Sequence, residues 1–226
     1  MATYIERYFK KSDPTYQDFL IFLRQRIEEN QTLEYKPRGL LVYQDDSIVP
    51  DSAPGRGFLT LAKIVAGFAN AEGGLLVLGV KERPESFRGV KQRILPGSVS
   101  AIPLNVTREI IENQLLAKIQ YPIDNLLIVP LRSSTRSKHF VYLIDVPQSS
   151  RVPHRVNELY YYQRYNFSTI DMKHYQIADL FGKRIAPVLD VLAERSQGLN
   201  EERGHITLNV GVRDHRDRVL CRSFAL

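Results

Sequence analysis

Two glutamates and a lysine in one short stretch are the residues best placed for chemistry. Glu29 and Glu34 stand five residues apart in EENQTLEYK, and Lys36 follows two residues later. A third acid, Glu82, follows the aliphatic segment LLVLGV and one lysine. Mg²⁺ and Mn²⁺ prefer carboxylate oxygens, and a bound cation could neutralise a phosphodiester and position an attacking oxygen. A nearby lysine would stabilise the charge of the transition state.

The two glutamates can meet only if a helix ends between them. On one continuous helix of about 3.6 residues per turn, Glu29 and Glu34 would point about 140° apart. Asn30 is expected to end the helix, because asparagine tolerates the left-handed conformation found at helix ends. Residues 32–36 then alternate as a strand, which places Glu34 and Lys36 on one face about 6.6 Å apart. Otherwise these are ordinary surface side chains.

The pattern around these residues predicts an α+β fold, with helices packed on a mixed β-sheet. Helices are expected over residues 14–30, 61–68, 106–119 and 174–195, and Pro187 should kink or divide the last one. Strands are expected over residues 32–36, 40–43, 75–80, 126–131, 140–146, 159–164, 205–212 and 219–224. The expected domains are residues 1–195, a linker over 196–204, and a β-hairpin over 205–226 that could begin a second domain.

Composition narrows the class of protein. The chain has 226 residues, of which 43% are hydrophobic and 25% charged, as is ordinary for a soluble globular protein. Its apolar runs fall short of the roughly 20 residues that span a bilayer, and the N-terminus lacks a signal-peptide core. A cytoplasmic protein with no membrane partner is expected. Cys221 is the one cysteine, which excludes an internal disulfide and a multi-cysteine zinc site.

The glycines of FANAEGG do not predict a nucleotide site. They follow a helix, and a helix C-terminus carries negative dipole charge that repels phosphate. The chain also lacks the G-x-x-x-x-G-K-[ST] motif, so no nucleotide cofactor is expected.

Basic residues gather in one part of the chain. The formal net charge is +6, and residues 132–164 hold six lysines and arginines against two acids. An anionic partner is one interpretation of this excess. Solvated hairpin loops are the other.

Four segments resemble, in order, the Schlafen AlbA-type domain family: EENQTLEYK, VAGFANAEGGLLVLGVKE, VYLIDVPQSSRVPH and YYYQRYNFSTI. The resemblance spans roughly residues 29–181 and implies a nucleic-acid-binding domain. The Schlafen branch of the family includes metal-dependent endoribonucleases that act on transfer and ribosomal RNA. Carried over, their catalytic acids fall on Glu29, Glu34 and Glu82, which would hold Mg²⁺ or Mn²⁺ with Lys36 beside them. Lys81 replaces a further acid of the family's GVDD motif.

The resemblance also assigns the basic residues to a groove that follows a phosphate backbone. Its expected members are Lys36, Arg38, Arg151, His154, Arg155 and Arg164. At least one of the tyrosines at 160–162 should face solvent and stack on a base, and Tyr161 is expected to be that residue. The zinc site of animal Schlafens has no counterpart here, and a two-lobed binding cleft would require a homodimer.

Three functions remain open from the sequence. The first is a divalent-metal-dependent endoribonuclease acting on structured RNA such as tRNA. The second is a non-catalytic DNA- or RNA-binding module with a regulatory or defence role. The third is an interaction domain that binds no nucleic acid.

Overall fold

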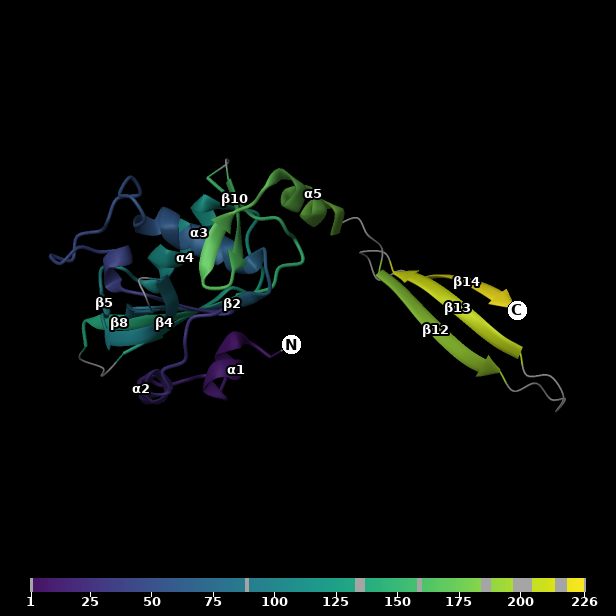
Figure 1. Cartoon of the computed structure of the whole chain (residues 1–226), viewed down its shortest axis with the longest axis horizontal. Coiled ribbons are helices and arrows are strands. Elements are labelled where there is room, and N and C mark those ends of the chain that lie inside the picture. Colours follow the sequence, from purple (N-terminus) through teal and green to yellow (C-terminus); the bar gives the residue numbers. More distant parts are fainter. Residues whose placement is uncertain are drawn as a thin grey trace. The chain divides into compact units, whose positions relative to one another are not determined.

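The structure of this protein is a computed structural model (Figure 1), which describes residues 2–87, 90–132, 137–157, 160–183, 188–196, 205–213 and 219–225. The chain forms two compact units, Met1–Leu180 and Phe181–Leu226. Among the described residues, no helix combines the length and the hydropathy that crossing a membrane requires.

A mixed five-stranded sheet forms the centre of the first unit. Its strands, in spatial order, are β1 (Leu33–Lys36), β2 (Gly73–Leu78), β8 (His139–Pro147) and β5 (Ile102–Pro103), and β7 (Leu127–Leu131) also pairs with β8. β1 and β2 are parallel, whereas β8 is antiparallel to each of its neighbours. The α+β class with a mixed sheet, predicted from the sequence, is confirmed.

Helices cover both faces of this sheet (Figure 1): α1 (Tyr4–Phe9) and α2 (Tyr16–Arg24) lie on one face, and α3 (Gly57–Ala69) and α4 (Arg108–Lys118) lie on the other. Alternation along β2 explains how one strand serves both cores. Leu75 and Val77 pack with Phe22 of α2, whereas Leu76 and Leu78 join the core around α3 and α4. Every residue of β2 is therefore buried.

A second, four-stranded sheet also packs against α3. Its strands, in spatial order, are β11 (Ser168–Asp171), β10 (Tyr160–Tyr165), β9 (Arg155–Val156) and β6 (Ile119–Gln120). Asn70, which caps the C-terminus of α3, ties this sheet to the helix. Its Nδ2 donates to the carbonyl oxygens of His154 at 2.9 Å and Tyr162 at 2.8 Å, and its Oδ1 accepts from the His154 backbone nitrogen at 2.6 Å. Helix α3 is thus held between two sheets.

The remaining elements connect or extend these layers. In the first unit they are η1 (Arg38–Leu40) and the antiparallel pair β3 (Val80–Phe87) and β4 (Val90–Val99). Helix α5 (His174–Lys183) follows β11. The second unit contains an antiparallel sheet of β12 (Val188–Ser196), β13 (His205–Arg213) and β14 (Val219–Ala225). The hairpin predicted over residues 205–212 and 219–224 is confirmed by the pairing of β13 with β14.

Two predictions about the N-terminal region are wrong, and one helix there was not predicted. The helix expected over residues 14–30 begins after its cap at Thr15 and ends at Arg24, and the left-handed residue beyond it is Arg26 (φ 51°), not Asn30. The strand expected over 40–43 is replaced by η1 and a single bridge between Val42 and Ile48. Helix α1, with a capping box between Thr3 and Glu6, was not predicted because its 6 residues make fewer than two turns and leave little periodicity.

The long helix predicted over residues 174–195 is also wrong. Helix α5 ends at Lys183, and residues 188–196 form the strand β12, paired along its whole length with β13. Apolar residues at 188, 189, 191 and 192 suit a strand as well as a helix, and Pro187 is a poor residue for a helix interior. The linker expected over 196–204 lies outside the described residues except for Ser196, which ends β12.

Candidate functional site

The glutamates singled out in the sequence converge, and the ammonium group of Lys36 lies between two of them. Lys36 Nζ is 2.8 Å from Glu34 Oε1 and also donates to Glu82 Oε1. Strand β1 places Glu34 and Lys36 on one face, as predicted, and the start of β3 brings Glu82 to the same ammonium. We call Glu29, Glu34, Lys36, Glu82 and Arg164 the acid centre.

Arg164 enters the acid centre from β10 and is only 2% exposed. Its Nη1 donates to Glu34 Oε2, while Nη2 donates to the carbonyl oxygens of Asn30 at 3.1 Å and Leu33 at 3.3 Å. The guanidinium also lies 5.0 Å from the centroid of the Phe68 ring. Arg164 therefore neutralises Glu34 from inside the protein, and its burial removes it from the surface groove in which it was expected.

Glu29 reaches the acid centre from the loop between α2 and β1. Its Oε1 accepts a hydrogen bond from the Tyr35 backbone nitrogen at 2.8 Å, and its own backbone nitrogen donates to Ile94 at 2.8 Å. Within the part of the chain that the structure describes, the buried Oε2 has no hydrogen-bond partner. Burial raises the pKa of Glu29 to about 7, and the nearby Lys36 charge offsets only part of that effect.

Lys36 is firmly charged in this setting. Burial lowers the pKa of a lysine, but the negative charges of Glu34, Glu29 and Glu82 outweigh that effect and raise the pKa of Lys36 above its ordinary value. The ammonium therefore stays positive across the physiological range.

The donor set does not fit a divalent ion, although carboxylates suit Mg²⁺ and Mn²⁺. Lys36 and Arg164 occupy both oxygens of Glu34, and Lys36 takes Glu82 Oε1 as well. Across the residues that the structure describes, no group of three histidine, cysteine, aspartate or glutamate side chains is arranged to hold a metal. Lys36 lies where a cation shared by Glu34 and Glu82 would have to bind.

The remaining residues expected to bind nucleic acid do not form one exposed face. His154 is fully buried and bonded to Asn70, while Arg38 is paired with Asp46. Arg151 is exposed and lies 3.2 Å from Asp124. The sequence shows that each of these residues is basic, but it does not show which residue will pair with it in the folded protein.

Tyr161 was predicted to be the exposed tyrosine, but the exposed one is the preceding residue, Tyr160. Tyr161 is partly buried and packs with a small cluster formed by Val152, Met172 and Leu180, the last of which belongs to α5. Tyr162 is 6% exposed, whereas Tyr160 is 53% exposed. Tyr160 is thus the tyrosine among 160–162 whose ring is open to solvent.

An open cleft lies over the acid centre, and it contains residues that the sequence did not single out. Its lining residues are Lys36, Pro37, Gly39, Leu40, Gly55, Arg56, Thr60 and Glu82. Arg56 is the N-cap residue of α3 and Thr60 lies in its first turn. Lys63 follows on the same face of the helix, since residues three or four apart are neighbours. The polar spacing 56, 60, 63 in an otherwise apolar helix was the available signal.

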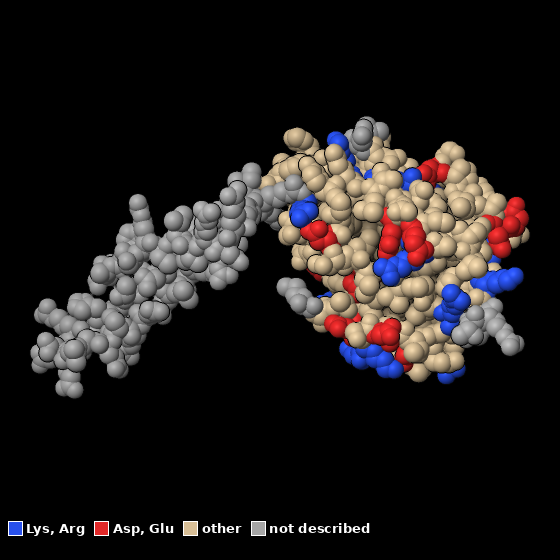
Figure 2. Space-filling model, turned by 180° about the vertical axis from the view of Figure 1, so that it is seen from behind, with Lys and Arg blue, Asp and Glu red and all other residues tan. Residues whose placement is uncertain are grey.

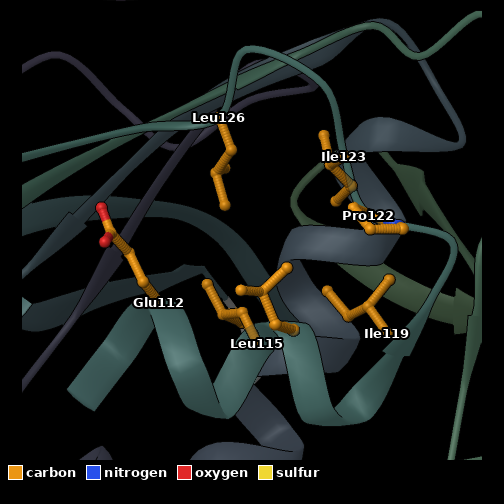
Figure 3. Close-up of a pocket in the computed structure, with 7 residues that line it drawn as sticks. Glu112, Leu115, Ile119, Pro122, Ile123 and Leu126 are labelled. Carbon is orange, nitrogen blue, oxygen red and sulfur yellow. The ribbon is translucent and has the colours of Figure 1, made fainter. Parts of the chain in front are cut away.

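Two further features of the surface bear on ligand binding. Figure 2 shows one face of the molecule on which lysines and arginines are interspersed with acids instead of forming a field of one sign. A second cavity lies between α4 and the loop that follows it (Figure 3), and aliphatic side chains point into it from both. Its lining residues are Glu112, Leu115, Leu116, Ile119, Pro122, Ile123 and Leu126.

The position of Lys36 predicts how the protein responds to Mn²⁺. The melting temperature of the wild-type protein should not change with millimolar MnCl₂, because Lys36 already neutralises Glu34 and Glu82. Lys36→Met should instead gain Mn²⁺-dependent stabilisation of a few degrees, since it frees carboxylate oxygens for the ion. Lys118→Met, which removes a lysine paired with Asp51, is the matched control. Stabilisation of the wild type by Mn²⁺ would contradict this assignment.

The raised pKa of Glu29 predicts a pH-dependent loss of stability. Between its ordinary pKa of 4.5 and about 7, unfolding releases the Glu29 proton, so the folded state becomes less stable as pH rises. Glu29→Gln keeps the acceptor for Tyr35 and has no such titration. Relative to this variant, the wild type should lose up to about 3 kcal/mol across that window, measured by urea unfolding at pH 5 to 8. Parallel stability curves for the two proteins would refute the assignment.

Comparison with known proteins identifies the family. No curated protein matches the sequence significantly. The crystal structure of the DIP2311 protein from Corynebacterium diphtheriae is similar to this chain, with 19% sequence identity and a TM-score of 0.41. The similarity covers 73% of this chain and 26% of the DIP2311 chain. This chain therefore spans about a quarter of the length of the DIP2311 protein. A family model described as Schlafen, AlbA_2 matches residues 29–173, which include the whole acid centre. The chain therefore belongs to the Schlafen, AlbA_2 family, and this membership points to a nucleic-acid-related function.

Proposed function

We propose that the protein is a nucleic-acid-binding module and that the cleft beside α3 is its contact surface. One observation carries the proposal: Arg56 lines this cleft, Lys63 follows on the same face of α3, and neither forms an ion pair with any residue that the structure describes. Cations that are not neutralised within the protein are the ones available to replace counterions on a phosphate backbone. Family membership supports the same class of ligand.

The charge balance of the cleft favours binding at its outer edge. Lys36 is engaged by Glu34 and Glu82, so it adds little to the attraction of a polyanion. Arg56 is exposed and Lys63 half-buried, and both lie on the side of the cleft formed by α3. A phosphate backbone should therefore follow α3 and avoid Glu82.

Metal-dependent cleavage of structured RNA such as tRNA is the competing proposal. The convergence of Glu29, Glu34 and Glu82 speaks for it. The ion pairs of Glu34 with Lys36 and Arg164 speak against it, because an incoming ion would have to displace Lys36 from two carboxylates. We therefore favour a module that binds without cleaving.

Fluorescence anisotropy with a labelled oligonucleotide tests binding. The affinity should fall steeply as salt rises, since phosphate contacts release counterions. The double variant Arg56→Ala/Lys63→Ala should bind at least tenfold more weakly. Its slope of log affinity against log salt concentration should be shallower by about two, since two phosphate contacts are lost. Arg24→Ala/Lys10→Ala removes the same charge from the surface near α1 and α2 and should bind as the wild type does. Equal loss in both double variants would show that net charge, not this cleft, determines affinity.

Cleavage is tested with the same protein and a transfer RNA in the presence of Mn²⁺. We expect no cleavage. Metal-dependent cleavage that is lost in Glu82→Gln, with binding retained, would establish the competing proposal. Glu82 is the suitable position because removing Glu34 would leave the buried Arg164 without its carboxylate.

A further inference from the structure

We infer that the cleft beside α3 takes a single nucleic-acid strand, with phosphates on Arg56 and Lys63 and one base stacked on the ring of Tyr160. The inference rests on the proposed nucleic-acid binding and adds the form of the ligand and the residue that contacts a base. It comes from cationic and aromatic side chains that connect α3, beside the cleft, to β10.

Helix spacing and ring contacts connect these side chains. Thr60 lines the cleft with Arg56, and Lys63 stands about 4.5 Å further along the helix axis, one turn away. Lys63 Nζ lies 5.3 Å from the centroid of the Tyr162 ring. The Tyr162 and Tyr160 rings have centroids 6.2 Å apart at an angle of 42°. Lys63 of α3 is therefore linked to the exposed Tyr160 through the Tyr162 ring.

Tyr160 has the properties of a stacking platform. The residue is 53% exposed, while its neighbour Tyr162 is buried and packs against the Tyr160 ring from one side. Stacking of a base on an exposed aromatic ring stabilises single-strand complexes by about 1–3 kcal/mol per base. Lys63, whose Nζ lies 5.3 Å from the centroid of the neighbouring Tyr162 ring, is the cation that we assign to the phosphate of the stacked nucleotide.

The geometry favours one strand over a duplex. In a duplex each base is covered on both sides by its neighbours, so a tyrosine can stack only on a base that has left the stack. Arg56 and Lys63 lie on one helix face within about 10.5 Å along its axis, which follows one backbone and not two. Acids limit the track on both sides: Glu82 lies within the cleft, and Asp171 of β11 is opposite Tyr162.

The test compares labelled single strands of about 12 nucleotides, oligo-dT and oligo-U, with a duplex of the same length, a size suited to one binding domain. The wild type should bind at least one single strand tenfold or more tightly than the duplex at equal salt. Tyr160→Ala should weaken single-strand binding about 5- to 100-fold, while Tyr160→Phe keeps the ring and should bind normally. Tyr165→Ala, at a 62% exposed tyrosine on the opposite face of β10, is the control and should bind as the wild type does.

A fluorescent reporter gives a second readout. The chain has no tryptophan, so Tyr160→Trp introduces a single one, which single strands should quench by stacking, whereas Tyr165→Trp should respond little. If no nucleic acid binds the wild type, the proposed function itself fails. If the protein binds but prefers the duplex, or if Tyr160→Ala and Tyr160→Phe bind single strands equally well, this inference is overturned and the proposed function stands.

Discussion

The buried pair between Arg164 and Glu34 is the interaction on which the arrangement of the first unit depends. A guanidinium at 2% exposure is strongly destabilising unless its charge and its donors are satisfied. Glu34 supplies the charge, and the carbonyl oxygens of Asn30 and Leu33 accept further hydrogen bonds. Because Arg164 belongs to β10 and Glu34 to β1, this pair fixes the second sheet to the first across Phe68 of α3.

The same pair determines the character of the acid centre. With Arg164 on one oxygen of Glu34 and Lys36 on the other, the carboxylate is neutralised within the fold. Lys36 extends the network to Glu82, while Glu29 retains a buried oxygen without a partner and a raised pKa. Most of the charge of the acid centre is thus neutralised within the protein. A ligand is therefore expected to contact the side chains around the cleft.

Local pattern predicted the elements of the site better than their contacts. The placement of Glu34 and Lys36 on one strand face was correct because strand alternation is a local property. The helix break at Asn30 was wrong, since α2 ends at Arg24 and Glu29 arrives from a loop. The pairing of Arg164 with a glutamate 130 residues away has no local signal, so an arginine counted as exposed proved to be buried.

Helix α3 shows how the core limits the surface that remains for binding. Its buried positions pack between two sheets, which leaves Arg56, Thr60 and Lys63 as its polar edge. The next position on that edge is Gly67, where an added Cβ would lie 2.8 Å from the Thr169 side chain of β11. Strand β11 therefore closes the edge one turn beyond Lys63. A backbone following α3 must leave the helix there, one turn beyond Lys63, whose Nζ lies over the Tyr162 ring of β10.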